Sequence, residues 1–149
     1  MQDRPLLRPE LYRQVVKPYH RRLFRFVRET FGGRLLFHSD GAIAPLIPDL
    51  IEMGIDAINP VQVSAAGMDP ETLKREFGRD IAFWGGGCDS QRVLPFGRPG
   101  EVADEVKRRL DALAPGGGYV FGPIHNVQAG VPMENLVTMF RVAREYGVY

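Results

Sequence analysis

The feature of the sequence that most restricts the fold is a fourfold alternation between short apolar runs and helical patterns. The apolar runs are expected strands at residues 34–38, 55–60, 81–84 and 119–121, and a helical pattern follows each of them. Strands that alternate with helices over short connections pair in parallel, because each helix carries the chain back along the sheet. The sequence therefore predicts an α/β fold.

Helix signals place the helices between these strands. A first helix is expected from Pro9 to Gly32, with an interruption at Pro18. Asp69 is placed to accept hydrogen bonds at the start of the next clear helix, and Pro70 suits its first position. A further helix is predicted from 99 to 113, and a last one from 132 to about 147.

The length of 149 residues limits what four such units can form. A closed (β/α)₈ TIM barrel needs eight strands and roughly 250 residues. Four units are therefore either a small open α/β domain or about the last four β/α units of a barrel. We treat residues 1–149 as one domain, a half barrel of the TIM type in the second alternative.

Composition excludes several classes of protein. No apolar run approaches the roughly 18 residues of a membrane span, and Met1–Pro5 lacks the apolar core of a signal peptide. A net charge of +1 argues against an electrostatic nucleic-acid binder. The single cysteine, Cys88, cannot form an internal disulfide, which is typical of a cytoplasmic protein.

The charge is uneven along the chain. Residues 1–34 hold nine basic and three acidic side chains, while the remaining residues carry a net negative charge. The basic start is either a solvated helix face or a surface that meets an acidic partner or the rest of a larger protein.

Polar residues follow directly after each predicted strand. Because the carboxyl ends of parallel strands meet at one edge of the sheet, these residues are expected to lie together and form the functional site. The catalytic candidates are His38, Asp40 and His125, and the candidates for binding substrate are Asn59, Gln62, Asp89, Gln91 and Asn126.

Two interpretations of these histidines remain open. A histidine at a strand end either packs within the structure or takes part in catalysis. His38, Asp40 and His125 also supply nitrogen and oxygen ligands suited to Zn²⁺, and Cys88 adds a sulfur unless it is a buried filler. The glycine run 85–87 follows a strand but lacks the spacing of a nucleotide-binding loop, so close backbone packing is the better explanation.

The order of these motifs resembles the carboxyl-terminal half of the uroporphyrinogen decarboxylase superfamily. That superfamily includes the decarboxylases of haem biosynthesis and cobalamin- or coenzyme M-dependent methyltransferases. The resemblance implies a (β/α)₈ barrel, of which this chain holds the last four units, and it covers about residues 9–149. The segments that carry it are 37–41 (FHSDG), 54–62 (GIDAINPVQ), 73–78 (LKREFG), 86–89 (GGCD), 115–119 (PGGGY) and 125–136 (HNVQAGVPMENL).

The two branches imply different chemistry. In the decarboxylases a histidine after the last strand lies near the substrate carboxylates, and His125 matches it. In the methyltransferases zinc is held by a His-x-Cys pair, a glutamate and a last cysteine. His38 matches the histidine, whereas Asp40, Gln62 and His125 stand near the other three positions.

The leading functional hypothesis from the resemblance is decarboxylation of a carboxylated tetrapyrrole in porphyrin biosynthesis, a lyase reaction that needs no cofactor. The alternative is a corrinoid-linked methyltransferase, with zinc on His38, Asp40 and His125 and a methyl-corrinoid protein as partner. A third hypothesis is a non-catalytic fragment, or a half barrel that pairs as a homodimer, because four strands leave two open edges.

Overall fold

One parallel sheet of four strands organises the computed structural model, which describes residues 1–147. The strands pair in sequence order, so each neighbour in the chain is also a neighbour in the sheet. Their carboxyl ends therefore lie at one edge, and the predicted α/β class is confirmed. The strands are β1 (Leu36–His38), β2 (Ala57–Asn59), β3 (Ala82–Trp84) and β4 (Tyr119–Val120), each shorter than the apolar run that predicted it.

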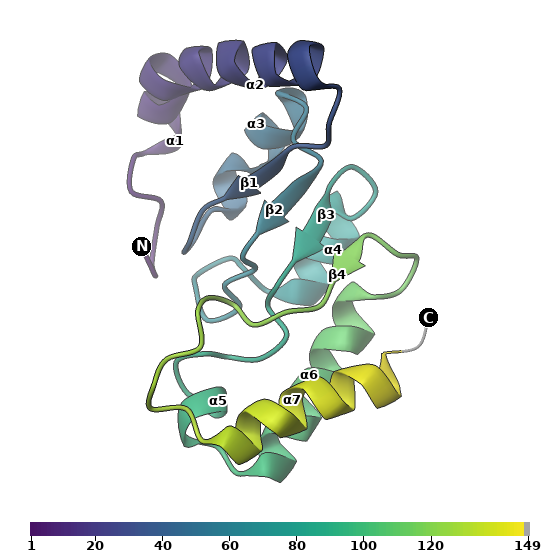
Figure 1. Ribbon diagram of the computed structural model, residues 1–149. Helices are drawn as coiled ribbons and strands as arrows, with labels where there is room; N and C mark the ends of the chain where they lie inside the picture. The colour runs from purple at the N-terminus through teal and green to yellow at the C-terminus, as the bar shows by residue number, and fades with distance from the viewer. Residues whose placement is uncertain (148–149) are drawn as a thin grey trace.

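Helices connect the strands and flank both ends of the sheet (Figure 1). Helices α3, α4 and α6 lie in the three connections, whereas α2 precedes β1 and α7 follows β4. A 3₁₀ turn at Ala44–Leu46 and the short α5 were not predicted. The helices are α1 (Pro9–Leu11), α2 (Lys17–Phe31), α3 (Ile47–Glu52), α4 (Pro70–Phe77), α5 (Val93–Phe96), α6 (Pro99–Leu113) and α7 (Met133–Tyr146). No helix in residues 1–147 is long and apolar enough to cross a membrane.

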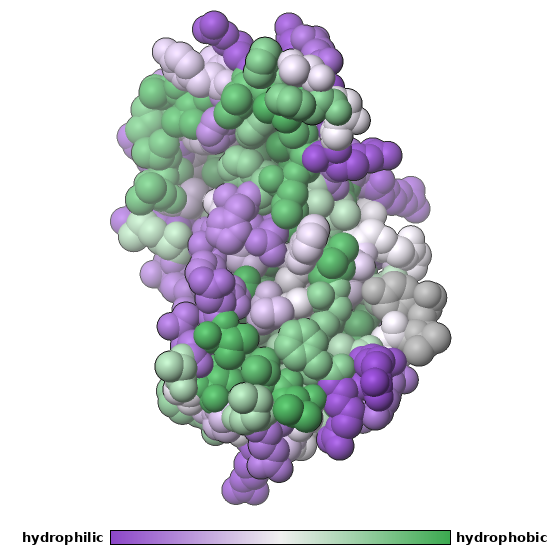
Figure 2. Space-filling view, viewed as in Figure 1, coloured by the Kyte–Doolittle hydropathy of each residue, from purple (hydrophilic) through white to green (hydrophobic). Residues whose placement is uncertain are grey.

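The two faces of the sheet differ in burial. Ile58 and Phe83 are neighbours in the β2–β3 register, and both side chains are fully buried in the core. On the other face, Leu36, Trp84 and Val120 are between 42% and 47% exposed. Figure 2 shows hydrophobic side chains on the molecular surface on this side, where a sheet buried on both faces would present none.

Helix starts follow the sequence signals closely. The Asp69 carboxylate accepts a hydrogen bond from the Thr72 backbone N–H at 2.9 Å, as the predicted N-cap requires. In α6, Val102, Val106 and Leu110 are all buried. Their spacing of four residues keeps them on one face of the helix, which is why the periodicity was informative.

The predicted interruption of the first helix near Pro18 is confirmed, as a change of helix type rather than a break in the helical run. Tyr12–Val16 forms a π-helical turn that joins α1 to α2, and Pro18 lies in the first turn of α2. Proline lacks an N–H, and at the start of a helix this costs nothing. Regular α-helix thus stops at Leu11 and resumes at Lys17, one residue before the proline.

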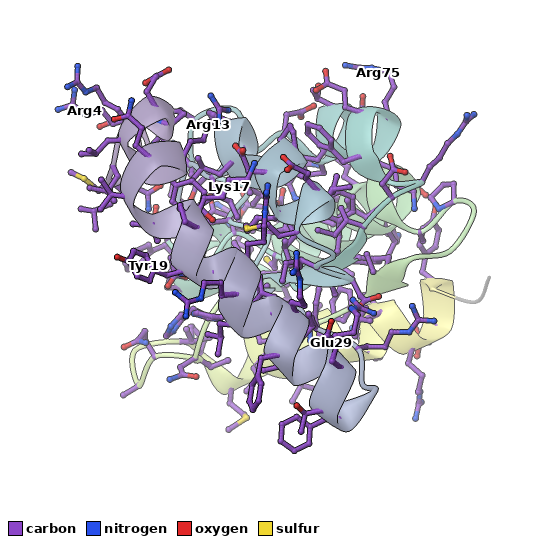
Figure 3. The ribbon with its side chains drawn as sticks, turned by 90° about the horizontal axis from the view of Figure 1, so that it is seen from above. Arg4, Arg13, Lys17, Tyr19, Glu29 and Arg75 are labelled. Carbon is purple, nitrogen blue, oxygen red and sulfur yellow. The ribbon has the colours of Figure 1, made fainter. Side chains whose placement is uncertain are left out.

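Basic residues at the start of the chain form ion pairs with acidic residues elsewhere in the molecule. Lys17 and Arg13 contact Asp49 with N–O distances of 2.6 and 3.0 Å, and Arg21 pairs with Glu52. Farther along α2, Arg28 pairs with Asp56. Figure 3 shows Arg13 and Lys17 on one side of the helical run and Tyr19 on the opposite side. These charges thus attach the first helices to α3 and to the start of β2.

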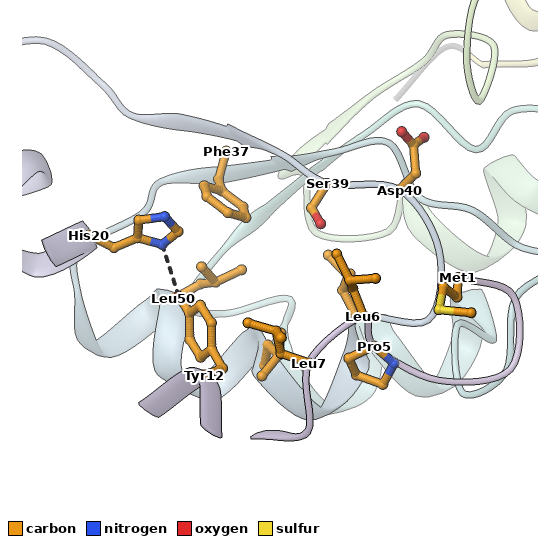
Figure 4. A pocket seen from close by; sticks show the side chains of 12 residues that line it. Met1, Pro5, Leu6, Leu7, Tyr12, His20, Phe37, Ser39, Asp40 and Leu50 are labelled. Carbon is orange, nitrogen blue, oxygen red and sulfur yellow. Dashed lines mark hydrogen bonds between the residues drawn. The ribbon is translucent and has the colours of Figure 1, made fainter. Parts of the chain in front are cut away.

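The apolar side of the first helices encloses a cavity of about 200 Å³ against β1 and α3. Leu6, Phe37 and Leu50 line it, and the Tyr12 hydroxyl lies 3.2 Å from His20 Nδ1 (Figure 4). Burial lowers the pKa of His20, which keeps the ring neutral. This histidine therefore belongs to the packing of α2 rather than to the polar edge of the sheet.

Replacing Phe83 with alanine should reduce the free energy of unfolding by about 3–5 kcal/mol, because the ring is fully buried. Val120→Ala on the exposed face should cost well under half as much. Urea unfolding followed by circular dichroism measures both. Equal losses would show that the face carrying Val120 is covered in solution.

Replacing Asp49 with asparagine should reduce stability at pH 7 by about 1–3 kcal/mol, because two cations lose a charged acceptor. Burial alone would raise the pKa of Asp49, but the hydrogen bonds from Lys17 and Arg13 outweigh it and the pKa is lowered. This contribution is present above the ordinary carboxyl pKa of 3.8 and is lost as the pH falls below it.

The difference between Asp49→Asn and the parent protein should therefore shrink in unfolding experiments at acidic pH. Glu29→Gln on the exposed part of α2 is the matched control and should change stability little at any pH. An Asp49→Asn protein as stable as the parent at pH 7 would contradict the attachment of α2 by these ion pairs.

Candidate functional site

Three of the predicted site residues converge at the carboxyl edge of the sheet. His38 ends β1, Asp40 lies two residues later, and His125 lies in the loop that follows β4. One potential ligand atom from each of these side chains lies within 4.8 Å of the other two. The two imidazole rings meet edge to face, with centroids 5.9 Å apart. His125, which is 85 positions or more from the other two residues, thus joins them in one cluster, and all three side chains are exposed.

His38 is held in place by the neighbouring strand. The β1–β2 register pairs His38 with Asn59, and His38 Nδ1 lies 2.8 Å from Asn59 Oδ1. The Asn59 Nδ2 group donates to the Trp84 carbonyl oxygen on β3 at 3.1 Å. Three adjacent strands therefore contribute to the orientation of one imidazole ring.

The donor atoms of the cluster are of types that zinc accepts. His38 Nε2 lies 3.4 Å from Asp40 Oδ2. Two ligands bound at about 2.0–2.1 Å to a tetrahedral zinc lie about 3.3 Å apart, so this pair already has the required separation. Two nitrogen ligands and one carboxylate oxygen also form a ligand set found in catalytic zinc sites, which leave a fourth position open.

A hollow of about 420 Å³ adjoins the cluster. Asp40 and His125 belong to its wall, together with the predicted substrate-binding residues Gln62, Gln91 and Asn126. The Gln62 side chain is also engaged within the protein, because its Oε1 accepts the Gly41 N–H at 2.7 Å. It therefore supports the turn that carries Asp40, while Gln91 and Asn126 lie at the more exposed rim.

Two other candidates lie outside the cluster. Asp89 Oδ1 accepts backbone N–H groups of Gln91 and Arg92, at 2.8 and 3.2 Å, and so caps the turn after β3. Cys88 is fully buried, and burial, with smaller contributions from Glu105 and Asp89, raises its pKa to about 12. A buried, protonated thiol is a core side chain, so Cys88 is not the sulfur ligand that the sequence left open.

The glycine run after β3 packs the loop closely against its neighbours. Gly85 has φ of +90°, and a Cβ there would lie 2.9 Å from the Pro123 carbonyl oxygen. At Gly87 a Cβ would lie 2.9 Å from the Gly122 carbonyl oxygen. These glycines therefore serve close backbone approach, as the sequence predicted.

The sequence did not indicate the link between His38, Asn59 and the Trp84 carbonyl. Asn59 was expected to bind substrate because it follows a strand. Its contact with His38 depends on which residues of β1 and β2 face one another, and periodicity does not specify that register. The Trp84 contact uses a backbone oxygen, which side-chain patterns do not report at all.

The fold and the cluster define the class of this protein: a parallel α/β protein with a candidate catalytic site at the carboxyl edge of its sheet. A family model described as uroporphyrinogen decarboxylase (URO-D) matches residues 4–146, and the chain belongs to this family. A sequence search of curated proteins found no match.

Among solved structures, the chain is similar to a methyltransferase from Methanosarcina mazei, with a TM-score of 0.72 and 18% sequence identity. The match covers 96% of this chain and 39% of that methyltransferase. The likeness thus extends over nearly all of the α/β fold described above, and the chain spans well under half the length of the methyltransferase.

The Cys88 thiol should not react with Ellman's reagent in the folded protein at a pH of about 8, because it is buried and protonated. One thiol per chain should react after unfolding in guanidinium chloride, since the sequence contains a single cysteine. Absorbance of the released chromophore measures both. Rapid reaction without denaturant would show that the Cys88 thiol is accessible in the folded protein.

Proposed function

We propose that this chain provides the zinc-binding edge of a methyltransferase-type enzyme within the URO-D family. The observation that carries the proposal is the convergence of His38, Asp40 and His125, whose ligand atoms lie within 4.8 Å of one another. The structural likeness to a methyltransferase supports the fold on which this edge is built.

The residues of the chain have separate roles in this proposal. His38 Nε2, an oxygen of Asp40 and a ring nitrogen of His125 would hold the metal, and a bound zinc ion would supply a Lewis acid with one open coordination position. Gln91 and Asn126 at the rim of the hollow would orient the reacting group by hydrogen bonds. Gln62 would keep Asp40 in position through the Gly41 turn.

The proposed enzyme is a larger assembly than this sheet. We interpret the four strands as the last four units of a (β/α)₈ barrel, because one face of the sheet exposes Leu36, Trp84 and Val120 and both edge strands have one neighbour. Further strands would cover that face and complete the walls of the site. A methylated donor, such as a methyl-corrinoid protein, would approach the carboxyl edge.

Decarboxylation of a porphyrinogen is the second candidate. It is favoured by the family description and by the adjacent His38 and His125 rings, which are suited to hold a carboxylate or move a proton. The zinc proposal is preferred because it uses all three side chains of the cluster.

The protein should bind one zinc ion per chain, and His125→Ala should weaken binding by more than about 100-fold, since even changes around the ligands typically cost about 10–100-fold. His20→Ala removes a histidine outside the cluster and should leave zinc affinity unchanged. Competition with a fluorescent chelator at neutral pH measures all three proteins.

Absence of zinc binding, or equal loss in His20→Ala and His125→Ala, would overturn the zinc proposal. The complete barrel, with the further strands present, should also be tested without zinc. If it releases carbon dioxide from a porphyrinogen, the decarboxylase is favoured instead. Circular dichroism of each variant separates loss of ligand from loss of fold.

A further inference from the structure

Both polar atoms of the Asn59 amide are committed to the protein. Nδ2 donates to the Trp84 carbonyl oxygen at 3.1 Å, and Oδ1 lies 2.8 Å from His38 Nδ1. The reverse amide orientation would set two oxygens against each other at Trp84. The network therefore assigns the amide oxygen to His38.

This assignment fixes the tautomer of His38. An amide oxygen only accepts hydrogen bonds, so the His38 Nδ1 atom 2.8 Å away must carry the proton. In a neutral ring the other nitrogen, Nε2, then holds a lone pair. That nitrogen is the one that lies 3.4 Å from Asp40 Oδ2, on the side of the cluster.

We infer that Asn59 is a positioning residue, which holds His38 in the Nδ1–H tautomer with Nε2 directed at the metal position. The inference rests on the zinc site proposed above and adds a residue that acts through His38. Metal-binding histidines commonly donate their second N–H to a carboxylate, a carbonyl or water, and here an amide oxygen takes that place.

The surroundings of Asn59 are built for this contact. The strand register places Asn59 directly beside His38, and Trp84 belongs to the next strand, so backbone pairing holds all three. Gly85, with φ of +90°, lies beside the amide, and a Cβ there would be 3.4 Å from Asn59 Nδ2. These contacts give Asn59 a role in the protein beside the substrate binding expected from its position after a strand, since one N–H and one oxygen lone pair of the amide are still available.

The first test is the tautomer of His38 in the metal-free protein. Long-range ¹H–¹⁵N correlation spectra at a pH of about 8, where an ordinary imidazole is neutral, distinguish Nδ1–H from Nε2–H. The parent protein should show His38 protonated at Nδ1. Asn59→Ala should shift the ring toward Nε2–H, whereas Asn59→Asp keeps an acceptor and should retain Nδ1–H.

The second test is zinc affinity, measured with the metal alone by chelator competition. Asn59→Ala should weaken zinc binding by about 10–100-fold, the usual effect of losing an outer partner of a metal ligand. Asn59→Asp should recover only part of that loss, because its carboxylate accepts the same N–H but sets an oxygen against the Trp84 carbonyl in place of the Nδ2 donor. Gln14→Ala, an exposed amide on the first helical run, is the matched control and should change neither readout.

The outcomes separate the two proposals. A parent protein with His38 protonated at Nε2, or an Asn59→Ala protein with unchanged tautomer and unchanged zinc affinity, would overturn the positioning role and leave the zinc site standing. A parent protein that binds no zinc, with the tautomer as expected, would overturn the proposed function instead. Circular dichroism shows whether Asn59→Ala still folds. If it does not, Asn59→Asp and Asn59→Leu are compared in the same two measurements.

Discussion

The candidate site depends first on the register between β1 and β2. Parallel pairing sets His38 beside Asn59, and the next pairing brings the Trp84 carbonyl within reach of the same amide. A shift of one residue along β1 would turn the His38 side chain to the helix-covered face, since side chains alternate along a strand. The ring orientation, the approach of Asp40 and the meeting with His125 all follow from this register.

Much of the fold could be predicted from the sequence, because its signals are local. Asp69 and Pro70 marked a helix start, and Val102, Val106 and Leu110 marked a buried helix face. Pro18 marked the interruption of the first helix, although its sequence context did not indicate that a π-helical turn forms this interruption. The ion pairs of Lys17 with Asp49 and of Arg28 with Asp56 are long-range, so uneven charge along the chain could not identify them.

The sequence predicted which residues gather at the site better than it predicted what each residue does there. Placement after parallel strands was enough to bring His38, Asp40 and His125 together. Cys88 and Asp89 satisfy the same rule, yet one is buried in the core and the other caps a turn. The direction of a side chain decides whether it faces the functional site or stabilises the fold. The local backbone geometry sets this direction, and position after a strand does not.

The chain combines a family fold with a donor set of two histidines and one aspartate, on a sheet that is open on one face. We propose that this cluster holds zinc. Crystals of the protein soaked with zinc, and measured on both sides of the zinc absorption edge, provide a direct test. We expect one anomalous peak within bonding distance of His38 Nε2, Asp40 and His125. No peak at the cluster, or one on surface carboxylates alone, would contradict it.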